Sequence, residues 1–123
     1  MAKSQNSFDR WIPMYRLCIA DLPNYGNVPA VYAIRHCTTR EILKYGHTQH
    51  LRQRIVMNFL CGWGGATTHR VFLELYDNEM VECVEVAWIQ AKSKAEAQRM
   101  EGQFRRAYME VHGGQRPPWD RQN

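Results

Sequence analysis

The 123-residue sequence lacks several features that define large classes of proteins. No apolar run approaches the roughly 20 residues needed to cross a bilayer, and residues 1–7 contain no apolar core of a secretory signal. There is no internal repeat and no low-complexity tract. With 45% hydrophobic residues, the chain can form one core. We therefore expect a cytoplasmic protein with no membrane partner and a single core.

Signatures of metal centres and catalytic nucleophiles are also absent. No HExxH string or phosphate-cradling P-loop occurs, and no neighbouring residues orient a Ser-His-Asp or Cys-His centre. The cysteines lack the close pairs of structural zinc sites, which favours reduced thiols; they are Cys18, Cys37, Cys61 and Cys83. We expect no small organic cofactor, and any catalytic residues must be dispersed along the chain.

Positive charge is concentrated in one stretch. The net charge is +4, and residues 35–54 alone carry five cations against one glutamate, so the other residues sum to zero. A local basic surface is typical of proteins that bind polyphosphates, although a solvated face without a partner explains the same pattern. The charged residues of this stretch are Arg35, Arg40, Glu41, Lys44, Arg52 and Arg54.

Three strands are predicted from alternation and turn chemistry. Residues 31–34 and 42–45 form a hairpin across a turn at 37–40, and the third strand lies within 81–88. Because side chains alternate across a strand, Tyr32 shares a face with Ile34, whereas Lys44 and Tyr45 point to opposite faces.

Three helices complete the pattern. Thr48 is a plausible N-cap for a helix to about residue 60, Thr67 and Thr68 open a short second helix, and a capping box of Ser93 and Glu96 starts a helix to about residue 111. The order β-β-α-α-β-α predicts a small α+β domain over residues 30–123, with helices against a three-stranded mixed or antiparallel sheet. Residues 1–29 form an N-terminal extension packed on that core.

Glu101 is the most informative single residue. It falls inside the apolar arc of the last helix, which Ala97, Phe104 and Tyr108 define. A carboxylate there is costly unless a cation meets it. It can be a ligand of Mg²⁺, which takes few protein oxygens. It can equally pair with an arginine or extend to the edge of the helix.

Three further residues have chemistry suited to a phosphodiester. Arg54 can clamp a phosphate and oppose charge at a pentacovalent phosphorus, or it can pair with Glu101 or solvent. Tyr32 can accept a proton from water or hold that water, or it can be a core tyrosine with one hydrogen bond. Lys44 can lower the pKa of Tyr32, or it can be a solvated strand lysine.

Contacts to nucleic acid are expected from residues around the first helix. His47 and His50 flank its start and can touch phosphate, although each is also an ordinary surface histidine. Trp63 lies in the glycine-rich stretch 62–65 and can pack against a base or groove, or simply belong to a flexible loop.

Two short strings carry a family resemblance. Residues 30–32 read AVY, residues 44–46 read KYG, and a helix containing Arg54 follows directly. Together with Glu101, these strings resemble the GIY-YIG superfamily of endonucleases over roughly residues 29–120. The tail at residues 117–120 resembles the closing segment of that family.

The resemblance implies a small α/β sandwich with a central three-stranded antiparallel sheet. It also implies Mg²⁺-dependent hydrolysis of one DNA strand per active site, with Mn²⁺ as a substitute. Tyr32 would then be the general base or position the water, Arg54 would stabilise the transition state, and a metal on Glu101 would assist the departing 3′ oxygen.

The chain departs from the family pattern at three positions. Ala30 replaces the glycine of the first motif, and Lys44 replaces the first tyrosine of the second. Asp120 stands where the family commonly has asparagine, with Asn123 as a second match. Whether Tyr32 or Lys44 handles the proton is left open by these changes.

The sequence therefore predicts a Mg²⁺-dependent DNA endonuclease, which would need a homodimer on DNA or successive events to cut both strands. Two alternatives remain: a nucleic-acid-binding module of the same fold without catalysis, and a small interaction domain without nucleic acid. The expected catalytic residues are Tyr32, Lys44, Arg54 and Glu101, with Glu101 as metal ligand. The expected DNA contacts are Arg35, Arg40, His47, His50, Arg52 and Trp63, and Asp120 is the closing-segment residue.

Overall fold

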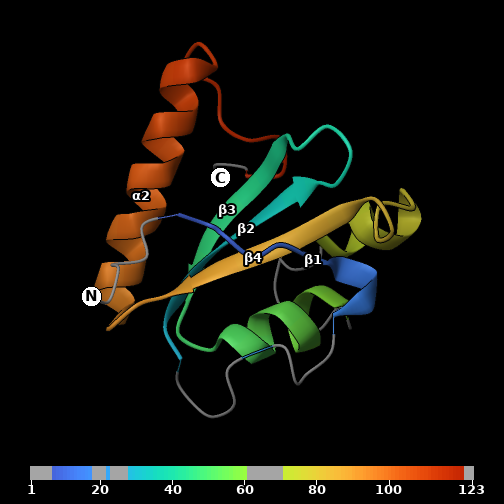
Figure 1. Ribbon diagram of the computed structural model, residues 1–123, viewed down its shortest axis with the longest axis horizontal. Helices are drawn as coiled ribbons and strands as arrows, with labels where there is room; N and C mark the ends of the chain where they lie inside the picture. Colours follow the sequence, from blue (N-terminus) through green and yellow to red (C-terminus); the bar gives the residue numbers. More distant parts are fainter. Residues whose placement is uncertain (1–6, 18–21, 23–27, 61–70, 121–123) are drawn as a thin grey trace.

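A computed structural model describes residues 7–17, 22, 28–60 and 71–120 (Figure 1). Its centre is one antiparallel sheet with the strand order β1-β4-β2-β3. The strands are β1 (Ile12–Pro13), β2 (Ala30–His36), β3 (Ile42–Thr48) and β4 (Val84–Gln90). The small α+β domain is thus confirmed, but the sheet has four strands rather than three because β1 lies in the N-terminal extension.

Helical segments pack on both faces of this sheet (Figure 1). The long helix α2 (Lys94–Val111) contacts β2 and β3 on one face. The other face is covered by two π-helical segments, η3 (Gln53–Leu60) and η4 (Leu73–Asp77), and a single 3-10 turn, η1 (Met14–Arg16), follows β1. In the described part of the chain, no helix is long and apolar enough to cross a membrane.

Several boundaries differ from the predicted ones. Thr48 is the last residue of β3 rather than a helix cap, because the β2–β3 ladder extends to the pair Ala30 and Thr48. Its hydroxyl still accepts the His50 N–H at 3.0 Å. The third strand starts at Val84, after a turn at 81–83. Thr67 and Thr68 lie outside the described residues.

The cap of α2 is as predicted. The Ser93 hydroxyl accepts the Glu96 N–H at 3.1 Å, which satisfies one of the free donors in the first turn. The Glu96 carboxylate in turn accepts the Lys92 N–H at 2.8 Å. These capping contacts fix the residue at which α2 begins, and therefore which of its side chains face β3.

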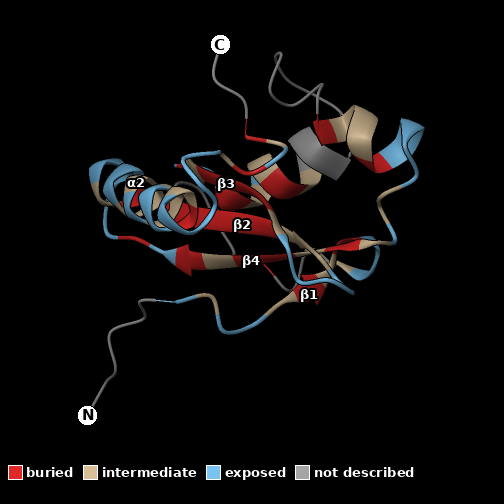
Figure 2. Ribbon diagram, turned by 90° about the horizontal axis from the view of Figure 1, so that it is seen from above, coloured by how far each residue is buried: buried red, intermediate tan, exposed pale blue. Residues whose placement is uncertain are grey.

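Two clusters of buried side chains form the core, one on each face of the sheet. Figure 2 shows that the buried positions are concentrated along the central strands. On the first face, Tyr32 and Ile34 of β2 pack with Leu51 and Ile55 below the sheet. On the second face, Tyr45 of β3 packs against α2. The partners of Tyr45 there are Ala33, Tyr108, Phe8, Trp11, Ile42 and Phe104.

The N-terminal residues belong to this second cluster. The Phe8 ring lies 4.7 Å from that of Phe104 and 6.1 Å from that of Tyr45, measured between centroids. Ile12 pairs with Val86 in the sheet. The described part of the extension is therefore integrated into the core that it was expected to pack on.

A β-bulge sets the side of the sheet on which the candidate site lies. Ile34 pairs with Lys44 and Arg35 pairs with Ile42, so Leu43 is the extra residue. Lys44 thus shares the face of Ile34 and Tyr32, while Tyr45 lies on the opposite face, as the alternation predicted.

Gly46 accommodates the ring of Tyr32. The two residues are register partners across β2 and β3. A Cβ atom at position 46 would overlap the Cζ and Oη atoms of Tyr32 and lie 2.8 Å from its Cε2 atom. The phenol therefore lies across the backbone of β3, a position that only glycine permits.

Gly46→Ala should destabilise the fold by about 1–3 kcal/mol, because the added methyl overpacks the Tyr32 ring. Urea unfolding measures this change. Gly102→Ala is the matched control: its methyl meets only the end of the flexible Arg106 side chain at 3.3 Å, and alanine is favoured over glycine inside a helix. Equal stability of Gly46→Ala and wild type would contradict the close packing.

Candidate active site

Lys44 is a buried amine on the edge strand β3. The residue is only 5% exposed. Burial lowers the pKa of Lys44 and is the largest effect on it. The carboxylates of Asp120 and Glu101 raise this pKa, and the guanidinium groups of Arg105 and Arg54 lower it further. Loss of hydration dominates, so the neutral amine is favoured relative to a lysine in water.

Tyr32 is also buried, but burial favours the protonated form of its phenol, whereas it favours the deprotonated form of the Lys44 amine. Burial raises the pKa of the phenol far above its ordinary value of 10.0, Arg54 lowers it, and Glu101 and Asp120 raise it further. A neighbouring cation does lower the pKa of this tyrosine, as expected, but that cation is Arg54 rather than Lys44, and the effect of burial outweighs it. The phenol stays protonated at neutral pH and acts as a hydrogen-bond group rather than a base.

The same charged groups act on both residues, which shows that they surround one region. Arg54 comes from η3, Glu101 from α2, and Asp120 from the segment after α2. Of the expected catalytic residues, Arg54 and Glu101 thus influence both Tyr32 and Lys44 electrostatically. Tyr32 and Lys44 share one face of the β2–β3 pair, whereas the Glu101 carboxylate contacts His47, which strand alternation places on the opposite face with Tyr45.

Glu101 is held by two side chains. Its Oε1 atom contacts Nδ1 of His47, and its Oε2 atom accepts a hydrogen bond from Nη2 of Arg105. The Glu101 side chain is 12% exposed. An arginine partner was one of the alternatives for this carboxylate, but the partner is Arg105, one helical turn along α2, not Arg54.

Arg105 also binds the tail of the domain. Its Nε atom donates to Oδ2 of Asp120 at 2.6 Å, so one guanidinium bridges two carboxylates. The Trp119 N–H donates to the Leu43 carbonyl at 2.7 Å, which fixes the tail against β3. Sequence reasoning missed Arg105, although its i+4 spacing from Glu101 is the usual signal for an ion pair on a helix.

This arrangement does not fit a bound divalent ion as it stands. Both Glu101 oxygens are engaged, one of them by a cation. Within the described ranges, no three histidine, cysteine or acidic side chains gather in a group that could hold a metal. A divalent ion would therefore have to displace an existing partner of Glu101.

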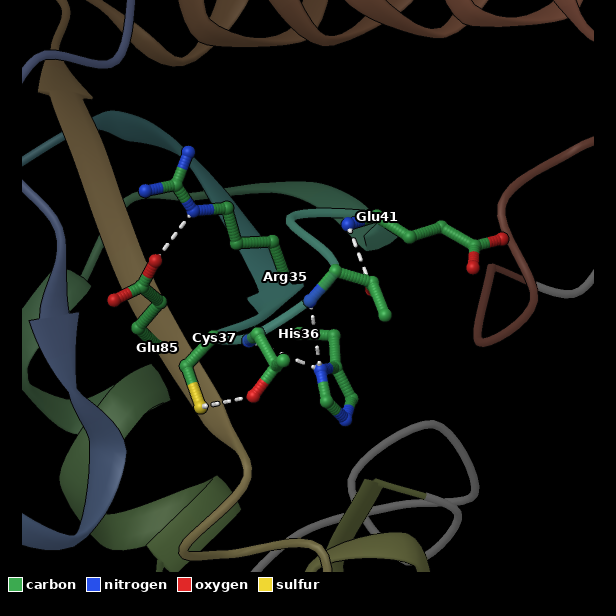
Figure 3. A network of polar contacts seen from close by, with 7 residues as sticks. Arg35, His36, Cys37, Glu41 and Glu85 are labelled. Atoms are coloured by element: carbon green, nitrogen blue, oxygen red, sulfur yellow. Dashed lines mark hydrogen bonds and ion pairs between the residues drawn. The ribbon is translucent and has the colours of Figure 1, made fainter.

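The expected DNA-contacting residues do not share one surface. The Arg35 Nε atom donates to Oε1 of Glu85 at 2.5 Å (Figure 3). The Arg35 guanidinium lies 4.0 Å from the centroid of the Trp11 ring. Arg35 and Glu85 are paired across β2 and β4 on the second face, away from Lys44. The basic stretch 35–54 is thus divided between two faces by strand alternation, rather than forming one patch.

The remaining predicted contacts have varied surroundings. Arg40 and His50 are exposed, and Arg40 lies in the hairpin turn with a φ of 63°. Nη2 of Arg52 donates to the Leu22 carbonyl at 3.4 Å. The nearby turn is closed by His36, whose Nδ1 atom accepts the N–H groups of residues 38 and 39 (Figure 3). Trp63 lies outside the described residues.

No protein-family model, curated protein or solved structure matches this chain. The resemblance to GIY-YIG endonucleases therefore depends on the motif residues themselves. Any function proposed for the chain must therefore be consistent with where these residues lie in the fold.

Replacing Lys44 by methionine should stabilise the domain at neutral pH by on the order of 1 kcal/mol, because it removes a buried amine. The lowered pKa of Lys44 means that the unfolded chain binds more protons between that pKa and the ordinary value of 10.5. This group therefore makes wild-type stability rise with pH over that interval, and Lys44→Met should lose the rise.

Urea unfolding of both proteins at neutral and mildly alkaline pH measures the difference. The series stays below pH 10.0, above which ionisation of Tyr32 in the unfolded chain lowers stability. Lys94→Met, at an exposed position of α2, is the control and should follow wild type. Identical pH slopes for Lys44→Met and wild type would contradict a lowered pKa.

Proposed function

We propose that the protein is a GIY-YIG-type DNA endonuclease that hydrolyses a phosphodiester bond in one strand per active site. The observation that carries the proposal is Lys44 itself, a lysine that is only 5% exposed and lies within the electrostatic influence of Arg54, Glu101 and Asp120. Removing a lysine side chain from water is costly to the fold. Such a cost is typical of a group that meets its partner in a substrate or a reactive water.

The neighbours of Lys44 supply what a phosphodiester needs. The guanidinium of Arg54 acts on both Lys44 and Tyr32, so a cation stands beside the amine and the phenol. A guanidinium matches phosphate oxygens in geometry and charge. The protonated Tyr32 hydroxyl can donate a hydrogen bond to a phosphate oxygen or to the attacking water.

The opposite pKa shifts of the two residues support Lys44, rather than Tyr32, as the group that takes the proton. Burial favours a neutral Lys44 and a protonated Tyr32, and groups pushed apart in this way take the roles of base and hydrogen-bond donor. In the proposed step, Lys44 Nζ takes a proton from water and the water oxygen attacks phosphorus. Arg54 opposes the growing negative charge. The bond from phosphorus to the 3′ oxygen breaks, and that oxygen takes a proton from solvent.

The Mg²⁺ requirement and the metal role of Glu101 remain predictions. None of the steps above uses a metal ion, because both Glu101 oxygens already have partners. The same observation favours the second candidate, a nucleic-acid-binding module of this fold that does not cleave. The two candidates share the phosphate-binding roles of Arg54 and Tyr32 and differ only in whether a bond is broken.

Supercoiled plasmid incubated with Mg²⁺ or Mn²⁺ tests cleavage. Arg54→Gln should slow nicking by about 100-fold or more, as expected when a donor to the transition state is lost. Lys44→Met should slow it at neutral pH through loss of the base. Arg99→Gln, an exposed residue on α2, is the control and should nick like wild type. Equal nicking by all four proteins would refute the site.

Fluorescence anisotropy with labelled duplex DNA separates the alternatives. An endonuclease and a binding module both give an affinity that falls as salt rises, because phosphate contacts release counterions. Binding without nicking in either metal would favour the module. No salt-dependent binding at all would favour an interaction domain that does not use nucleic acid.

A further inference from the structure

We propose that Arg105 is an internal cation that holds the Glu101 and Asp120 carboxylates together, so that a divalent ion binds this pair only in exchange for the guanidinium. The inference takes its ligand from the proposed function. It assigns to Arg105 the control of metal affinity.

The first support is the geometry of the bridge. Arg105 uses two different nitrogen atoms for two carboxylates, Nη2 for Glu101 and Nε for Asp120. The side chains of Glu101, Arg105 and Asp120 are 12%, 21% and 7% exposed. Two carboxylates so near each other and so little hydrated repel strongly unless a cation lies between them. The guanidinium is thus required for this pair in the metal-free protein.

The second support is the balance of charge. Glu101 and Asp120 bring two negative charges, and Arg105 brings one positive charge. The buried amine of Lys44 lies within the field of the same two carboxylates, which are the largest charge effects on it. A divalent ion entering beside Arg105 would turn the net negative charge of the three side chains into a net positive one, which opposes its binding. Departure of the guanidinium removes that obstacle.

The third support is donor chemistry. Hard divalent ions take carboxylate oxygens, the atoms that Arg105 now occupies. His47, on the other Glu101 oxygen, does not compete by charge unless it is protonated.

Isothermal titration calorimetry with Mn²⁺ as the probe tests the exchange on the full chain. Arg105→Gln should bind Mn²⁺ at least about tenfold more tightly than wild type, since the ion no longer displaces a guanidinium. Arg106→Gln is the matched control, an exposed arginine at the next position that should leave Mn²⁺ binding at the wild-type value. Adding Glu101→Gln to Arg105→Gln should abolish the gain.

Thermal unfolding gives a second measurement. Without metal, Arg105→Gln should melt below wild type, and Mn²⁺ should raise its melting temperature more than that of wild type, because binding to the folded state stabilises it. If Arg105→Gln does not fold without metal, Arg105→Lys keeps one positive charge near both carboxylates but lacks the two-nitrogen fork that bridges them, and it should still bind Mn²⁺ more tightly than wild type.

An unchanged Mn²⁺ affinity in Arg105→Gln, or in Arg105→Lys where Arg105→Gln does not fold, would overturn the inference. So would a gain that survives Glu101→Gln. These outcomes are distinct from failure of the proposed function, because neither measurement uses DNA. A protein that nicks nothing but binds Mn²⁺ tightly after loss of Arg105 would retain the exchange and refute the endonuclease.

Discussion

The pairing of β2 with β3 determines where every candidate residue lies. It places Tyr32 over Gly46 and sets Lys44 beside Ile34 on the same face. If the register slipped by one residue, Lys44 would move to the other face and an ordinary side chain would meet the Tyr32 ring. The bulge at Leu43 and the glycine at 46 fix that register. The chemistry proposed for the site therefore rests on a steric fit between a ring and a backbone.

The charged groups near the β3 edge largely neutralise one another. Burial penalises Lys44 and Tyr32 in opposite senses, and the carboxylates of Glu101 and Asp120 are in turn neutralised by Arg105. Such a network does not add much stability by itself, because removing charges from water offsets most of their attraction. It does fix the relative positions of groups from β3, α2 and the tail.

Much of the fold was predictable from local patterns. The three longer strands, the Ser93 cap and the opposite faces of Lys44 and Tyr45 all follow from alternation and capping chemistry. The extra strand β1 was not predictable, because two residues are too few to show the alternation of buried and exposed side chains that marks a strand. Thr48 was assigned to the helix because its hydroxyl suits a cap, but the strand ladder outcompeted that preference.

The site was predictable only in part, for a physical reason. Spacing along the chain indicates which residue types could act together, and it brought Tyr32, Lys44, Arg54 and Glu101 into one hypothesis. It does not say which partner satisfies a buried charge. Arg35 was counted with the basic stretch but pairs with Glu85 across the sheet, and Glu101 is held by Arg105. Partner choice depends on strand register and helix phase, which the sequence alone leaves open.

The hydrogen bond from Trp119 to Leu43 affects how two copies of this chain could associate. A bare outer strand invites a second molecule to add its own strand and continue the sheet. Here the returning tail already uses a carbonyl on that side of β3, and the opposite border consists of only the two residues of β1. The tail thus partly shields the outer side of β3 from a second copy of the chain, which makes helices and loops the more accessible surfaces for association.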